Sequence, residues 1–148
     1  MSIPACAVAP AAALVIVAGG GRALAWPVAR VRAALVHHAA GRPVLQLLHG
    51  DARGADQLIA AAARQLGWSV VAIAAEWHRH GRRAGPIRNR QLLEQALALA
   101  TSATPAGSVL VIAFPGGAGP ASLVQQARRS SLHVPMPVVV EAVEAQAA

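Results

Sequence analysis

The 148-residue sequence has no lysine and no tyrosine, and it contains one cysteine, one phenylalanine and six acidic residues. Without lysine it has no residue for a Schiff base, and it lacks the ATPase and GTPase phosphate loop that ends in Gly-Lys-Ser or Gly-Lys-Thr. The single cysteine, Cys6, cannot form an internal disulfide, which fits a reducing compartment, so we expect a cytoplasmic protein. No apolar run is long enough to cross a bilayer, and we expect no membrane contact.

All thirteen basic residues are arginines, and the formal net charge is +7. The total charge fits nucleic acid, a phosphorylated metabolite or an acidic partner equally well, so the position of the arginines is more informative than their number. Residues 77–90 hold five of them: Arg79, Arg82, Arg83, Arg88 and Arg90. A basic stretch that opens a helix at Pro86 suits an anionic group such as a phosphate.

Short runs rich in valine, isoleucine and leucine alternate with longer segments of helical periodicity, which is typical of a parallel sheet covered by helices on both faces. The length fits one domain. We assign it to residues 14–140, between an N-terminal tail of residues 1–13 and a C-terminal tail of residues 141–148. The expected strands cover about residues 14–18, 44–49, 69–74, 108–114 and 138–140.

Four helices are expected between these strands. The first begins near Trp26 and Pro27, and the second runs from about residue 54 to residue 66, with Ile59 and Ala62 facing inward. The third starts at Pro86, and the fourth covers about residues 121–130, after a glycine turn. Because Arg88 stands at the start of the third helix, we expect Arg88→Ala to weaken ligand binding and to leave the melting temperature nearly unchanged.

Three glycine-containing segments follow strands: residues 19–22, 49–56 and 115–119. Since the carboxyl ends of parallel strands meet at one edge of a sheet, these loops and the arginine stretch are expected to share one rim, where the strand order reverses. Consecutive glycines let backbone amides approach an anion, as in a phosphate-binding loop. Each turn taken alone is better explained as a tight link from strand to helix, whereas three such turns on one rim favour binding.

Several side chains have two interpretations. Arg53 either holds a phosphate or is solvated, and Asp56 either accepts a hydrogen bond from a ribose hydroxyl or complements the helix dipole. Trp77 either stacks on a ring of the ligand or fills the core. Glu76 is either a general base or an ion-pair partner of a nearby arginine. His78 has no nearby set of cysteines or carboxylates, so we expect no metal site.

The motifs together resemble one family. They are Val-Ile-Val-Ala-Gly-Gly-Gly-Arg at 15–22, His-Gly-Asp-Ala-Arg-Gly-Ala-Asp at 49–56, Trp77, Gly81-Arg82, Ala-Gly-Pro-Ile-Arg-Asn-Arg at 84–90 and Ala-Phe-Pro-Gly-Gly at 113–117. They resemble the small bacterial and phage SLOG family related to the YspA protein, over about residues 14–140. The resemblance implies a Rossmann-like three-layer sandwich with a mostly parallel sheet of about five strands, and a nucleotide-derived ligand.

The best-known SLOG enzymes are the cytokinin-activating phosphoribohydrolases, which place a threonine and then a catalytic glutamate after Pro-Gly-Gly-x-Gly. This sequence has Pro120 and Leu123 at those positions, so the resemblance does not carry over that chemistry. Asp51 also replaces a residue that is usually small. A local likeness to DNA-processing protein A, in Gly-x-Ala-Arg-Gly-x-Asp, gives the alternative of a module that binds single-stranded nucleic acid. The shortage of aromatic residues argues against stacking along DNA.

We therefore expect a domain that binds a nucleotide or nucleotide-derived small molecule at the strand ends, as a sensor or as a hydrolase of an N-glycosidic or phosphate-linked bond. In the hydrolase case, Asp56 and Glu76 are the candidate catalytic residues. We expect no cofactor, and a homo-oligomer. The expected ligand contacts are Gly20, Gly21, Arg22, Gly50, Arg53, Gly54, Asp56, Trp77, Arg88, Asn89, Pro115, Gly116, Gly117 and Gly119.

Overall fold

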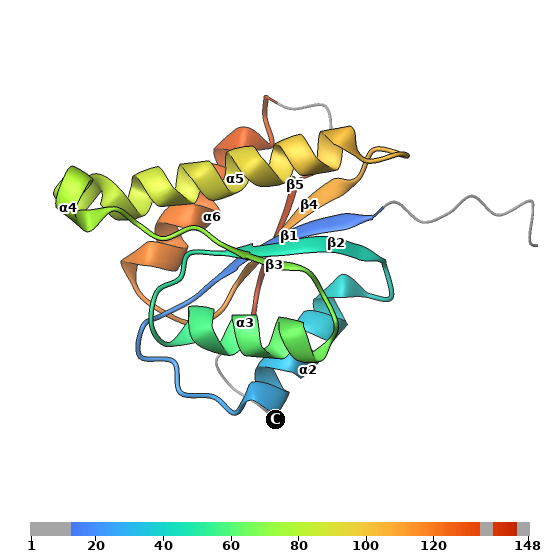
Figure 1. Cartoon of the computed structure of the whole chain (residues 1–148), viewed down its shortest axis with the longest axis horizontal. Coiled ribbons are helices and arrows are strands. Elements are labelled where there is room, and N and C mark those ends of the chain that lie inside the picture. The colour runs from blue at the N-terminus through green and yellow to red at the C-terminus, as the bar shows by residue number, and fades with distance from the viewer. Residues whose placement is uncertain (1–12, 134–137, 145–148) are drawn as a thin grey trace, which may run out of the picture.

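The computed structural model describes residues 13–133 and 138–144, which form a parallel five-stranded sheet between two layers of helices (Figure 1). The strand order is β3-β2-β1-β4-β5, and every neighbouring pair is parallel. The α/β Rossmann-like arrangement expected from the sequence is confirmed. The strands are β1 (Leu14–Gly19), β2 (Val44–His49), β3 (Val70–Ala72), β4 (Ser108–Ala113) and β5 (Val138–Ala142).

Two helices cover each face of the sheet (Figure 1). On one face lie α2 (Val28–Ala39) and α3 (Ala55–Gln65). On the other lie α5 (Ala84–Ser102) and α6 (Ala118–Ser130). The short helix α4 (Trp77–His80) and the 3-10 turn η1 (Gly81–Arg83) join β3 to α5.

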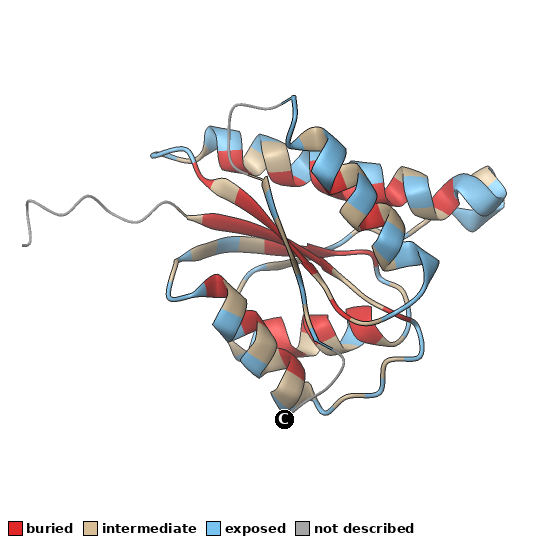
Figure 2. Cartoon of the chain, turned by 180° about the vertical axis from the view of Figure 1, so that it is seen from behind, coloured by how far each residue is buried: buried red, intermediate tan, exposed pale blue. Residues whose placement is uncertain are grey.

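The central strand β1 is apolar throughout because it is buried on both faces (Figure 2). Its side chains alternate between the two layers, as the strand period of two requires. Leu14 and Ile16 belong to the cluster that includes α2 and α3, whereas Val15 and Val17 belong to the cluster that includes α5 and α6. The continuous apolar sequence of β1 is therefore explained by side chains that pack into two separate hydrophobic clusters, one on each face of the sheet.

Some boundaries differ from the sequence-based expectation. The third strand is shorter than residues 69–74, and α4 lies where no helix was expected. The long helix α5 begins at Ala84, two residues before Pro86, because a proline in the first turn removes only an N–H that has no partner within the helix. For the same reason α6 begins at Ala118 and includes Pro120 in its first turn.

The last strand extends through Glu141 and Ala142, which pair with Ile112 and Ala113. Val143 then donates a hydrogen bond to the Ala113 carbonyl at 2.8 Å, so the sheet uses three residues that the sequence analysis assigned to the C-terminal tail. The expected N-terminal tail through residue 12, including Cys6, lies outside the described residues, as do residues 145–148.

The chain changes direction in the sheet between β1 and β4, because β2 and β3 lie on one side of β1 and β4 and β5 lie on the other. Ligands of open α/β sheets bind at such a point, outside the carboxyl ends of the strands. Within the part of the chain that the structure describes, no helix combines the length and the apolar character needed to span a membrane.

Candidate functional site

A cavity of about 830 Å³ opens at the carboxyl ends of β1 and β4, where the strand order reverses. This volume lies within the usual range of about 300–1,000 Å³ for small-molecule sites. The cavity brings together segments far apart in the sequence, including the loop after β1, the start of α5 and the start of α6. The expected ligand contacts that line it are Gly20, Gly21, Arg22, Gly50, Asp56, Trp77, Arg88, Asn89, Pro115, Gly116, Gly117 and Gly119.

The turns after β1 and β4 are glycine-rich because their backbones are packed against each other. The Gly21 amide donates a hydrogen bond to the Pro115 carbonyl at 2.8 Å, so it is not free to bind an anion. A Cβ atom on Gly21 would lie 2.6 Å from the Gly116 Cα, and one on Gly20 would lie 2.6 Å from the Ala55 Cβ. In these residues the absence of a side chain serves close packing of the cavity wall.

The amino terminus of α6 is different, because its glycines face open space. Added Cβ atoms on Gly117 and Gly119 would meet nothing within 4 Å. Gly117 is the N-cap residue, and no side chain caps this end of the helix. The amides at the start of α6 therefore remain available at the cavity wall, where the helix dipole favours an anion.

Arg88 and Asn89 lie in the first turns of α5 and connect it to the loop after β2 and to the first turn of α6. Arg88 is only 8% exposed. Its Nε donates to Asn89 Oδ1 at 2.9 Å, and its Nη1 donates to the Gly50 carbonyl. The Asn89 amide in turn donates to the Gly119 carbonyl at 3.2 Å. Burial lowers the pKa of Arg88, and the nearby Asp56 carboxylate opposes that shift. Arg88 therefore links α5 to the loop after β2. These contacts lead us to predict a loss of stability when Arg88 is replaced, in place of the unchanged melting temperature expected from the sequence.

Asp56 is buried at the base of the cavity, in the first turn of α3. Its Oδ2 accepts a hydrogen bond from the Ala52 amide at 3.0 Å. Its Oδ1 has no hydrogen-bond partner among the described residues, and a Cβ atom on Gly19 would lie 3.9 Å from it. Burial raises the pKa of Asp56, while the Ala52 amide and the positive charge of Arg88 act in the opposite direction.

His49, at the end of β2, is a buried titratable group that the sequence analysis did not select. Its Nδ1 accepts a hydrogen bond from the Asp51 amide at 3.0 Å, so the neutral ring carries its proton on Nε2. That Nε2 is buried without a partner among residues 13–133 and 138–144. Burial lowers the pKa of His49, against the influence of Asp56 and Asp51. The sequence signal that could have identified His49 is a histidine at the end of a buried strand, directly before Gly50 and Asp51.

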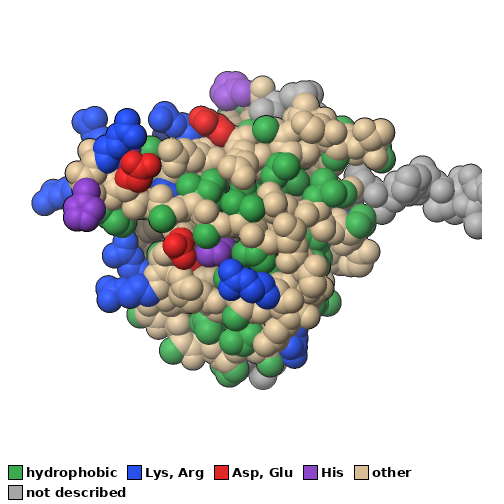
Figure 3. Space-filling model, in the orientation of Figure 1, with side chains coloured by type: hydrophobic (Ala, Val, Ile, Leu, Met, Phe, Trp, Pro, Cys, Tyr) green, Lys and Arg blue, Asp and Glu red, His purple; other side chains and the backbone are tan. Residues whose placement is uncertain are grey.

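Trp77 does not fill the core, because 47% of it is exposed and its ring lines the cavity. The Arg22 guanidinium lies over this ring, with Cζ 5.3 Å from the ring centroid. Arg82, which the motif analysis did not include among the contacts, also lines the cavity, and the space-filling view shows basic side chains gathered at the end of the molecule where α4 lies (Figure 3). This part of the cavity thus combines the aromatic ring of Trp77 with the positive charges of Arg22 and Arg82.

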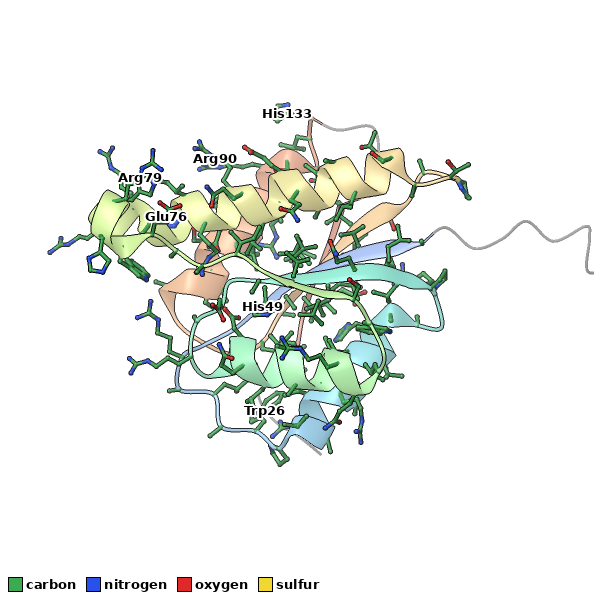
Figure 4. All side chains as sticks on the ribbon, viewed as in Figure 1. Trp26, His49, Glu76, Arg79, Arg90 and His133 are labelled. Atoms are coloured by element: carbon green, nitrogen blue, oxygen red, sulfur yellow. The ribbon has the colours of Figure 1, made fainter. Side chains whose placement is uncertain are left out.

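Three of the expected functional residues do not line the cavity. Arg53 is exposed, and Gly54 is a tight N-cap whose added Cβ would lie 2.2 Å from the Arg22 carbonyl oxygen. Glu76 precedes α4, where it forms an exposed ion pair with Arg79 at 3.6 Å (Figure 4). Glu76 is therefore poorly placed to act on a ligand in the cavity. No group of three metal-ligating side chains occurs among the described residues.

The fold and the position of the cavity define a Rossmann-like domain with a ligand site at the reversal of strand order. Residues 14–80 match the model of the YspA, cpYpsA-related SLOG family (YAcAr), so the predicted family is confirmed over this segment, which runs from β1 through α4. This relationship is consistent with nucleotide-related binding in general. Comparison with curated proteins and with solved structures found no match.

Proposed function

We propose that this protein binds a nucleotide or nucleotide-derived small molecule in the cavity and acts as a sensor of that ligand. The observation that carries the proposal is the composition of the cavity. A single space at the strand ends contains an uncapped helix terminus, arginine side chains and an exposed tryptophan ring. The helix terminus and the arginine side chains suit a phosphate, and the tryptophan ring suits an aromatic base.

In this proposal the phosphate binds the backbone amides at the start of α6, where a Cβ atom on Gly117 or Gly119 would meet nothing among the described residues, and Arg22 supplies positive charge. The base stacks on Trp77, whose ring is already in contact with the Arg22 guanidinium. An arginine between a ring and a phosphate can interact with both, because guanidinium groups stack on aromatic faces and bind phosphate oxygens.

Hydrolysis of the ligand is the catalytic form of the same proposal. Of the two candidate carboxylates, Asp56 lines the cavity and Glu76 does not. Asp56 is therefore the residue that we assign to acid or base chemistry in that case. Incubation of each bound nucleotide with the protein, followed by chromatography, would detect a released base or phosphate.

A thermal-shift panel tests binding directly. NAD, ADP-ribose, cyclic nucleotides and the common mononucleotides are added singly at increasing concentration. A ligand at about 100 times its Kd stabilises the native state by about 2.7 kcal/mol, which for a chain of 148 residues corresponds to about 9 °C in Tm. We expect Arg22→Ala to weaken binding about tenfold or more, since a hydrogen bond to a charged group is lost.

Arg90→Ala is the matched control, because Arg90 is an exposed arginine on α5 that does not line the cavity. It should bind the ligand as the unmodified protein does. A panel in which no compound raises Tm would contradict the proposal. Equal losses in Arg22→Ala and Arg90→Ala would mean that binding depends on overall charge, and would contradict the assignment to the cavity.

The exposed arginines of the α4 region support a second candidate, a module that binds single-stranded nucleic acid. In that case affinity for a labelled oligonucleotide must fall steeply with salt, because each contacted phosphate releases counterions. We favour the small molecule because the groups that suit a phosphate and a base line one cavity, whereas a strand needs an extended path and several aromatic residues on which successive bases can stack. Tight oligonucleotide binding with a steep salt slope and no response to mononucleotides would reverse this preference.

A further inference from the structure

The cavity has two chemically distinct ends, and the loop after β1 contacts the segments that form both. A Cβ atom on Gly116, in the turn that leads into α6, would lie 3.0 Å from the Gly20 carbonyl carbon. A Cβ atom on Gly20 would lie 2.6 Å from the Cβ atom of Ala55, the residue before Asp56, and one on Gly19 would lie 3.9 Å from Asp56 Oδ1. The α6 end offers amide donors and the Asp56 end offers an acceptor.

Asp56 Oδ1 is a buried acceptor that lacks a donor. Asp56 is 4% exposed, and its Oδ1 has no hydrogen-bond partner among the described residues. The hydrogen bond from the Ala52 amide to Oδ2 fixes the orientation of the carboxyl group. A buried polar atom left without a partner destabilises the protein, so a donor from a ligand would bind there favourably.

A phosphate does not suit this position, because two anionic groups repel each other in a partly desolvated site. Hydroxyl groups do suit it. A hydroxyl donates to a carboxylate and accepts from a protonated carboxyl group, so it pairs with Asp56 in either protonation state. The phosphate is left to the amino terminus of α6, which lines the cavity and has no side-chain cap among the described residues.

We propose that the cavity selects a ribonucleotide over its deoxy counterparts, because Asp56 Oδ1 accepts a hydrogen bond from a ribose hydroxyl while the start of α6 holds the phosphate. This proposal rests on the proposed function and orients the ligand, with its phosphate at the start of α6 and its sugar at Asp56. Both ends border the loop after β1, which fits the short separation between the phosphate and the sugar hydroxyls of one nucleotide. It also disfavours DNA, which lacks the 2′-hydroxyl and uses the 3′-hydroxyl in its backbone.

The test is calorimetric titration of the full-length protein with AMP, GMP, CMP and UMP, each compared with its 2′-deoxy and 3′-deoxy counterparts. For the nucleotides that bind, we expect removal of one of the two hydroxyls to weaken binding about tenfold or more, because Asp56 Oδ1 then remains without a donor. The variant Asp56→Ala, which removes every polar atom of the side chain, should reduce this difference to about twofold or less. Arg90→Ala should retain the full difference.

The outcomes separate the two proposals. If a ribonucleotide and both of its deoxy counterparts bind the unmodified protein equally well, the role of Asp56 is overturned and the proposed function stands. If no ribonucleotide, NAD, ADP-ribose or cyclic nucleotide binds, both fail. The comparison of ligands on the unmodified protein decides the matter even if Asp56→Ala does not fold. Where it folds, an undiminished preference for the ribonucleotide in Asp56→Ala also overturns the role of Asp56.

Discussion

Replacement of Arg88 by alanine should destabilise the ligand-free protein. The side chain is buried, and its guanidinium donates hydrogen bonds to the Gly50 carbonyl and to Asn89 Oδ1. Both acceptors belong to buried residues. Alanine would leave these two oxygens without their donor, and it would remove the positive charge that opposes the rise in the pKa of Asp56.

The size of the effect follows from these contacts. Hydrogen bonds from a charged donor contribute about 1.5–3 kcal/mol each, and removal of one partner from a buried charged cluster costs about 3–5 kcal/mol. Arg88 retains a small exposed area, so we take the lower end, about 3 kcal/mol. With an unfolding entropy of about 0.3 kcal/mol/K for 148 residues, Tm should fall by about 10 °C.

The assay is thermal and urea unfolding without ligand, followed by circular dichroism. Arg90→Ala is the control, since Arg90 lies two residues along the same helix, is 67% exposed and forms only a 3.7 Å ion pair with Glu94. Such a pair contributes less than about 1 kcal/mol. A Tm for Arg88→Ala within about 2 °C of the unmodified protein would refute the structural role and restore the expectation drawn from the sequence alone.

Three further predictions concern other parts of the site. Burial lowers the pKa of His49, so the unfolded state binds more protons than the native state as the pH falls through about 6.5. The contribution of His49 to stability is therefore present above that pH and is lost on acidification. His49→Asn should flatten the fall of Tm between about pH 7.5 and 5.5, whereas the exposed His78→Asn should not. Gly21→Ala should lower stability by about 1–3 kcal/mol in urea unfolding, because its Cβ would lie 2.6 Å from a backbone carbon. A Cβ on Gly119, within α6, meets nothing among the described residues, so Gly119→Ala should not unfold at a lower urea concentration than the unmodified protein. Trp77→Ala should weaken nucleotide binding about tenfold in a calorimetric titration, because a stacking surface is lost, with little change in Tm because the ring is half exposed; unchanged affinity would remove Trp77 from the site.

Most of the architecture could be predicted from the sequence because it follows from local patterns. The continuous apolar run of β1 indicated a strand buried on both faces, and Ile59 and Ala62 were correctly placed on the inner face of α3. The helix boundaries were less predictable. Proline in a first turn is compatible with several starting residues, so the position of Pro86 did not determine that α5 begins at Ala84.

Most of the expected site residues line one cavity because the ends of parallel strands meet at one edge, which is a property of the fold class. What each residue does there was not predictable from its type. Gly21 and Gly117 stand in similar glycine turns, yet the Gly21 amide is bound to Pro115 and the Gly117 position is open. Only the packing of one turn against the other produces this difference.

The sequence by itself therefore determined the fold class, the family resemblance and the edge of the sheet at which to look, since periodicity and motif spacing are local properties. The tertiary structure decided which charged groups are buried and which face the cavity. Arg88, chosen from the sequence as a ligand contact, forms hydrogen bonds within the protein, while one buried oxygen of Asp56 has no partner in the described part of the chain. Burial and hydrogen bonding depend on contacts between distant segments, and these exist only after the chain has folded.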